Sequence, residues 1–299
     1  MEHGWKFRGI SRFRLKFKSS FLAYSAVSFN DHPMQLPCTP SFRLDGRRAV
    51  VTGASKGIGL AAAAALAQAG AHVTLVARNP LELRAACKQI ETSGYQQGPC
   101  VAYAALDVTD SVGVSAWFQD EVANNGAFDI LVNNAGTNRP ALLADVRDED
   151  LDAVIDLNIK AAFYFSREMS RSFSVADGMR AYSGSIINMS SQMGHVGGPQ
   201  RTVYCATKHA IEGLTKALAW ELGKQQIRVN SLCPTYIETP MTEAMLSNSE
   251  FRKFAESGTA LGRVGRLDEI MGAVVFLASD ASSLMTGSAL MLDGGWTAR

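Results

Sequence analysis

Cysteine, charge and long apolar runs are all scarce in this sequence. Five of its 299 residues are Cys, and 19% are charged. The cysteines form neither a C-x-x-C pair nor a zinc-binding spacing, which favours reduced thiols and a cytoplasmic location. Apolar stretches end at Gly, Gln or His before membrane length, so we expect no membrane span. A net charge of +1, with no helix-turn-helix or basic-aromatic array, argues against nucleic-acid binding.

The first 41 residues differ in charge from the rest. Residues 1–41 hold six basic and two acidic residues, whereas residues 42–299 hold 23 basic and 26 acidic ones. Three interpretations are open: an organelle-targeting peptide within residues 1–33, a disordered tail, or an over-long translation start with Met34 as the true one. We favour the third, and expect a single domain over residues 42–299.

That domain alternates short apolar segments with longer amphipathic ones. The expected strands are uniformly apolar, which is typical of a parallel sheet covered on both faces. The pattern predicts a single Rossmann-like, doubly wound α/β domain of about seven strands with helices on both faces. The expected strands are 48–52, 72–76, 101–106, 128–133, 185–189, 227–232 and 289–292. The expected helices are 57–70, 80–93, 111–124, 148–175, 203–224, 241–256 and 267–279.

A glycine-rich turn joins the first strand to the first helix. Glycines there allow a tight turn and let a pyrophosphate approach the N–H groups of the helix terminus. The spacing is G-x-x-x-G-x-G, and its position on the first strand of a parallel sheet favours a dinucleotide site. The candidate cofactor-binding residues of this turn are Gly53, Ser55, Lys56, Gly57, Ile58 and Gly59.

The residues after the next three strands extend this site. An NAD-preferring enzyme places an acid after the second strand to bind the ribose 2′-hydroxyl, but Arg78 stands near that point. A guanidinium suits a 2′-phosphate, with Lys56 as a second cation, so we predict a preference for NADP(H) over NAD(H). Asp107 and Val108 end the third strand, where the acid can face the adenine. Small and amide residues then allow a close backbone approach after the fourth strand: Asn134, Ala135 and Gly136.

Tyr204 and Lys208 lie four residues apart on an expected helix and so share a face. A nearby ammonium favours the phenolate and should lower the pKa of the tyrosine from its usual ~10, which would make it a proton donor and acceptor. Ser191 follows the fifth strand and can hydrogen-bond a substrate oxygen as charge develops. Asn158 is a polar residue within the long expected helix.

The order of the glycine turn, Asn133–Gly136, Asn158, Ser191, Tyr204 and Lys208 resembles the short-chain dehydrogenase/reductase family. The resemblance covers residues 42–299 and extends to the segments 230–234 and 293–295. It implies a metal-free hydride transfer in which Tyr204 is the general acid/base, Lys208 lowers its pKa and holds the nicotinamide ribose, Ser191 steadies the substrate oxygen, and Asn158 positions a water molecule. It also implies nicotinamide contacts from Ile237 and Thr239. Thr235 departs from the family pattern, which often has Gly there.

The resemblance narrows the substrate to an alcohol or carbonyl compound. Candidate substrate residues are Arg139, Gln192, His195 and Tyr236, and they favour a hydroxylated or anionic compound such as a sugar, polyol or aldonate. A 3-oxoacyl-carrier-protein reductase is an alternative, because such relatives share nearly every motif. The family also implies a homotetramer packed through the helices at 148–175 and 203–224.

Two interpretations that give the protein a different kind of function are less well supported. A non-catalytic nucleotide sensor is possible in principle, but the intact tetrad argues against it. The G-x-S-x-G pattern at 53–57 fits a serine hydrolase, yet it lies on the first strand and leaves Tyr204 and Lys208 unexplained.

Overall fold

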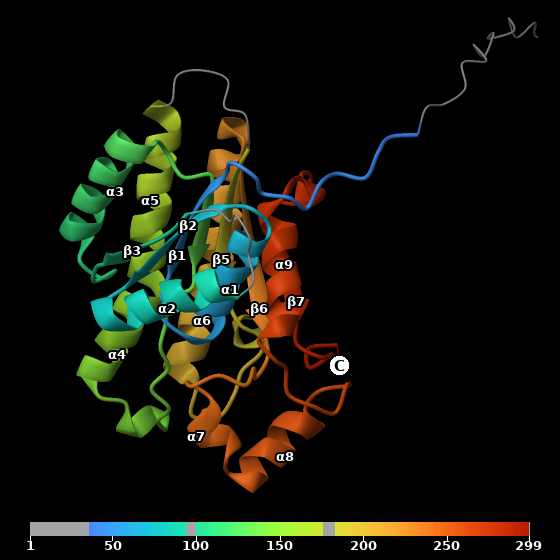
Figure 1. The fold of residues 1–299 in the computed structure, drawn as a ribbon. Helices are drawn as coiled ribbons and strands as arrows, with labels where there is room; N and C mark the ends of the chain where they lie inside the picture. The colour runs from blue at the N-terminus through green and yellow to red at the C-terminus, as the bar shows by residue number, and fades with distance from the viewer. Residues whose placement is uncertain (1–35, 94–99, 176–182, 299) are drawn as a thin grey trace, which may run out of the picture. The chain divides into compact units, whose positions relative to one another are not determined.

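Seven parallel strands form one sheet at the centre of the protein in the computed structural model, which describes residues 36–93, 100–175 and 183–298 (Figure 1). Residues 39–299 make up one unit of the chain. Most of the expected N-terminal extension lies outside the described residues. The strands are β1 (Arg48–Thr52), β2 (His72–Ala77), β3 (Val101–Ala105), β4 (Ile130–Asn133), β5 (Gly184–Met189), β6 (Ile227–Pro234) and β7 (Ala289–Leu292).

The strand order is β3-β2-β1-β4-β5-β6-β7, and every pairing is parallel. The chain adds β2 and β3 on one side of β1, and then adds β4 to β7 on its other side. In such sheets the carboxyl ends of the two central strands open a crevice that serves as the ligand site. The fold therefore directs attention to the turns after β1 and β4.

Helices cover both faces, as the apolar strands predict. On one face α1 (Gly57–Gln68), α2 (Pro80–Thr92) and α9 (Asp268–Ala278) pack against Ala49 and Val51 of β1. On the other face α3 (Ser111–Asn125), α5 (Ala161–Val175) and α6 (Thr202–Leu222) pack against Val50. Neighbouring residues of one strand thus face opposite layers, which confirms the doubly wound sheet.

The long helix expected over 148–175 is interrupted. It consists of α4 (Asp148–Ile155), a π-helical turn (Asp156–Lys160) and α5. Asn158, within the π turn, donates to the carbonyl of Thr137 and to the hydroxyl of Thr207, both at 3.0 Å. Wide turns of this kind often occur at functional sites, and this one directs a side-chain amide to the loop after β4.

The helix expected over 241–256 is also two helices, α7 (Glu243–Leu246) and α8 (Ser249–Ser257). Asn248 caps the second helix, because its backbone is extended and its side chain accepts from the N–H groups of Glu250 and Phe251, both at 3.0 Å. None of the helices in the described part of the chain combines the length and apolar character that crossing a membrane requires.

Candidate active site

The turns after β1 and β4 are joined by hydrogen bonds. The Thr52 hydroxyl accepts from the N–H groups of Asn134 and Ala135, both at 3.0 Å, and the Asn134 amide donates to the carbonyl of Gly53 at 3.1 Å. A Cβ at Gly59 would lie 2.3 Å from that Gly53 oxygen, which leaves room for glycine alone. The close approach of the two turns therefore depends on the glycines that the sequence places there.

The beginning of α1 is suited to an anion. Lys56 precedes the helix with extended backbone, no side chain caps the first turn, and that turn contains no acidic residue. Its N–H groups and the positive end of the helix dipole are therefore available for a phosphate. Thr239 reaches the same place, since its Cβ lies 3.7 Å from a Cβ built on Gly57. These residues fit a pyrophosphate.

Both basic and acidic side chains lie beside the glycine turn. Glu82, in the first turn of α2, accepts from the Ser55 hydroxyl at 2.9 Å and lies 3.8 Å from the Lys56 ammonium. Hydrogen bonds from the backbone N–H and the hydroxyl of Thr109 lower the pKa of Asp107, and nearby Arg78 lowers it further. Glu82 was not among the predicted site residues, although its place in the first turn of α2 follows from the sequence.

Tyr204, Ser191 and Lys208 come together at the carboxyl end of β5. The Tyr204 and Ser191 hydroxyls are hydrogen-bonded to each other. The Lys208 ammonium donates to the Met189 carbonyl at 2.7 Å and lies 5.6 Å from the centre of the Tyr204 ring. The strand end thus fixes the amine, and the helix holds the phenol beside it. Asn158 belongs to the same group of elements through its hydrogen bond to Thr207 of α6.

Burial has a larger effect than charge on the acidity of this pair. Desolvation raises the pKa of Tyr204 to about 12, opposed by its hydrogen bond with Ser191. Desolvation also lowers the pKa of Lys208 to about 8, opposed by the electrostatic effect of Cys233 and Glu212 beside it. The tyrosine pKa therefore moves in the opposite direction to the one expected from the sequence, because both groups are pushed toward their neutral forms in a water-poor environment.

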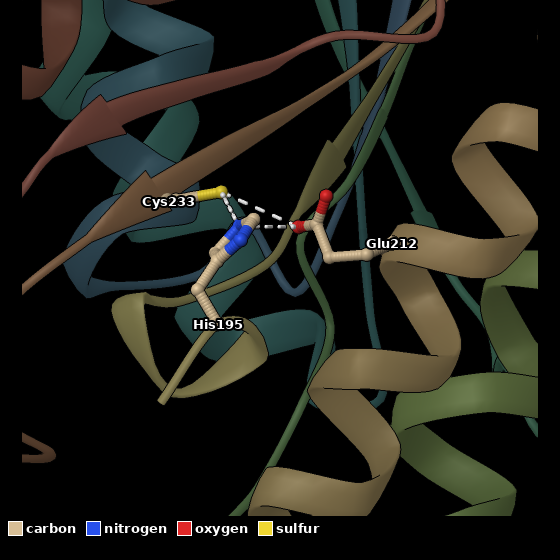
Figure 2. A group of neighbouring side chains, drawn as sticks. All are labelled: His195, Glu212 and Cys233. Carbon is tan, nitrogen blue, oxygen red and sulfur yellow. Dashed lines mark hydrogen bonds and ion pairs between the residues drawn. The ribbon is translucent and has the colours of Figure 1, made fainter. Parts of the chain in front are cut away.

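The four candidate substrate residues have different surroundings. Arg139 pairs with Asp150 of α4 and is half exposed. Gln192 follows Ser191 and is buried, and its side-chain oxygen has no hydrogen-bond partner among the described residues. Tyr236 packs edge-on against Phe251 and Trp296, with ring centres 5.3 and 5.8 Å away. His195 lies beside Glu212 and Cys233 (Figure 2).

Arg201 was not among the predicted site residues. Burial raises the pKa of both Tyr204 and Tyr236, and the positive charge of Arg201 opposes this rise. It also contacts the Met245 sulfur of α7 at 3.3 Å. Arg201 therefore links the tyrosines to the α7–α8 segment, which the sequence analysis could not infer from spacing.

Known proteins resemble this chain over most of its length. A family model described as enoyl-(acyl carrier protein) reductase matches residues 53–297. Gluconate 5-dehydrogenase of Gluconobacter oxydans is 38% identical over 256 residues, which is 86% of this chain and 96% of the relative. A 3-oxoacyl-acyl-carrier-protein reductase of Thermotoga maritima is 39% identical over 85% of this chain and 98% of its own length. A crystal structure of a gluconate 5-dehydrogenase from Burkholderia cenocepacia, in complex with NADP and tartrate, matches with a TM-score of 0.80 and 35% identity, covering 86% of this chain and 98% of that one.

The buried amine predicts how stability depends on pH. Because the pKa of Lys208 is lowered to about 8 from 10.5, the folded protein binds fewer protons than the unfolded chain between these values. The contribution of Lys208 to the free energy of unfolding should therefore rise as the pH increases from about 8 to about 10, by at most about 1.4 kcal/mol per pH unit. Urea unfolding of the wild type and Lys208→Met across this range measures the difference, which should be absent if the lysine titrates normally. Lys216→Met, on the same helix, is the matched control.

Proposed function

Because this chain belongs to the short-chain dehydrogenase/reductase family, we propose that it transfers a hydride between NADP(H) and a secondary alcohol or its ketone, within a sugar, polyol or aldonate. The observation that carries the proposal is the hydrogen-bonded pair of Ser191 and Tyr204 hydroxyls beside Lys208, at the same edge of the sheet as the glycine turn. The relatives named gluconate 5-dehydrogenase support the substrate class.

Each residue of the proposed site has one task. Tyr204 donates its phenolic proton to the substrate oxygen in reduction and takes a proton in oxidation. Ser191 hydrogen-bonds the same oxygen, and Lys208 supplies a positive charge near the phenolate whenever it is protonated. Asn158 holds the loop after β4 through Thr137, and we assign it the positioning of a water molecule. A nicotinamide dinucleotide, when bound, supplies the hydride chemistry.

The remaining assignments concern the cofactor. We propose that the dinucleotide contacts Gly53 to Gly59, Asp107 and Val108, Asn134 to Gly136, and Ile237 and Thr239. Arg78, Lys56 and Ser55 would hold the 2′-phosphate of NADP(H), for which the neighbours solved with NADP give support. Glu82 competes with that phosphate, because its carboxylate already accepts from Ser55 and lies near Lys56.

A 3-oxoacyl-carrier-protein reductase is the second candidate. It is favoured by relatives of that name at 39% identity. In contrast, the buried, unpaired oxygen of Gln192 favours a small polar substrate, because a buried polar atom without a partner costs free energy that a hydroxyl group can recover.

A substrate panel tests the proposed reaction. Sugars, polyols, aldonates and a β-ketoacyl thioester are each assayed by NADPH absorbance, and we expect turnover of at least one hydroxylated compound. Tyr204→Phe should lower kcat by roughly 10²–10⁴ because it removes the proton donor, while NADPH affinity stays within a few-fold. Tyr164→Phe, on α5, serves as the matched control. Full activity in Tyr204→Phe would contradict the mechanism, and turnover of the thioester alone would favour the second candidate.

Cofactor preference can be shifted in both directions. Arg78→Asp should favour NADH, because a carboxylate repels a 2′-phosphate and binds a 2′-hydroxyl. Glu82→Gln should tighten NADPH binding about tenfold, which corresponds to about 1.4 kcal/mol, with little effect on NADH. Dissociation constants for both dinucleotides come from fluorescence titration. Glu91→Gln, on the same helix, should change neither constant, and an unaltered ratio in Arg78→Asp would refute the assignment.

We also propose a cytoplasmic homotetramer. Trp220 of α6 is 90% exposed and Phe163 of α5 is 46% exposed, which is unusual for large apolar side chains and typical of subunit contacts. Trp220→Glu should dissociate the tetramer to smaller species, because it would place a charge in an apolar contact. Analytical ultracentrifugation measures the change, and Lys88→Glu, at an exposed position on α2, is the control. A wild-type monomer would overturn this proposal.

A further inference from the structure

Three metal-ligating side chains from separate elements meet beside the proposed active site. His195 follows β5, Glu212 lies on α6 and Cys233 lies on β6, and Figure 2 shows their side chains pointing toward one another. The Cys233 sulfur lies 3.5 Å from His195 Nε2 and 3.3 Å from Glu212 Oε1, and these two atoms are 3.5 Å apart. The proposed hydride transfer assigns no proton or hydride to any of the three.

We propose that His195, Glu212 and Cys233 form a binding site for a thiophilic divalent cation of the Zn²⁺ type. Tetrahedral zinc holds sulfur at about 2.3 Å and nitrogen or oxygen at about 2.0–2.2 Å, which places neighbouring ligand atoms about 3.3–3.6 Å apart. The three observed separations fall in this range. An ion just above the plane of the three atoms would reach all of them without a change in the backbone.

The chemistry of the ligands selects the ion. One sulfur, one imidazole nitrogen and one carboxylate oxygen suit zinc, whereas magnesium and calcium prefer sites made entirely of oxygen. Binding replaces the thiol proton: the S–H bond of Cys233 breaks, an S–Zn bond forms and the proton leaves to water, with no change of oxidation state. Thiolate and carboxylate together then balance the two positive charges of the ion.

The surroundings support the ligands and leave a route to them. The Ser231 hydroxyl donates to the second oxygen of Glu212 at 2.8 Å, which fixes the carboxylate, and metal sites commonly have such outer hydrogen bonds. Glu212 is almost fully buried, whereas 31% of the His195 side chain is exposed, so an ion can enter on the histidine side. Three protein ligands leave the fourth position of a tetrahedral ion to water.

Cobalt titration tests this site independently of hydride transfer. Co²⁺ is added to the full chain carrying Cys38→Ser and Cys100→Ser, which remove the two exposed thiols. We expect one equivalent to produce a thiolate-to-cobalt charge-transfer band that Zn²⁺ abolishes and Mg²⁺ does not. Cys233→Ala should eliminate the band, and His195→Gln, at a partly exposed position, should weaken binding by about 100-fold or more.

Two variants serve as matched controls. Cys87→Ala removes a buried thiol on α2, and His209→Gln removes a histidine on α6, and both should leave the titration unchanged. Saturating Zn²⁺ should also raise the melting temperature of the parent protein but not that of the His195→Gln variant. The absence of the charge-transfer band, or a band that persists in Cys233→Ala, would show that the three residues form only a hydrogen-bonded cluster.

Discussion

Lys208 is 5% exposed, and its amine donates to the last carbonyl of β5 at 2.7 Å. This hydrogen bond ties α6 to the carboxyl end of the sheet, and it does so through a group that costs free energy to bury when charged. The same burial acts on Tyr204 one helical turn earlier. The protein therefore holds a phenol with a raised pKa beside an amine with a lowered pKa.

Much of the fold could be predicted because its causes are local. All seven strands lie within a few residues of their expected bounds, since uninterrupted apolar runs between amphipathic segments have few alternatives. The two helices that were predicted in one piece show the limit. The π turn around Asn158 depends on Thr137 and Thr207, which are distant in sequence, and a periodicity of apolar residues carries no signal for such contacts. The family membership and the reaction class, expected from the motifs, are confirmed by the match over residues 53–297 and by the relatives.

The residues that the fold brings together could be predicted from the sequence, but the direction of their pKa shifts could not. Motif order was sufficient to select Ser191, Tyr204 and Lys208, which the fold brings together. Spacing could suggest that an ammonium lowers the tyrosine pKa, but it could not weigh that charge against desolvation, which requires knowing how deeply both groups are buried. The interaction partners of Arg139 and His195 could not be predicted from the sequence either. Arg139 meets Asp150, and His195 meets Glu212 and Cys233, only because loops and helices converge in three dimensions.

Counting the basic residues near the glycine turn is not sufficient to predict a preference between NAD(H) and NADP(H). The positive charges of Lys56 and Arg78 are balanced by the negative charges of Glu82 and Asp107. These four residues together therefore carry no net charge, although the sequence-based prediction rested on the two cations alone. The hydrogen bonds from Thr109 hold Asp107 in place, whereas Glu82 is 45% exposed and its contacts with Ser55 and Lys56 can be exchanged for water. A 2′-phosphate would thus compete with one mobile carboxylate for the same hydroxyl and ammonium. The proposed selectivity therefore depends on Glu82 as well as on Arg78.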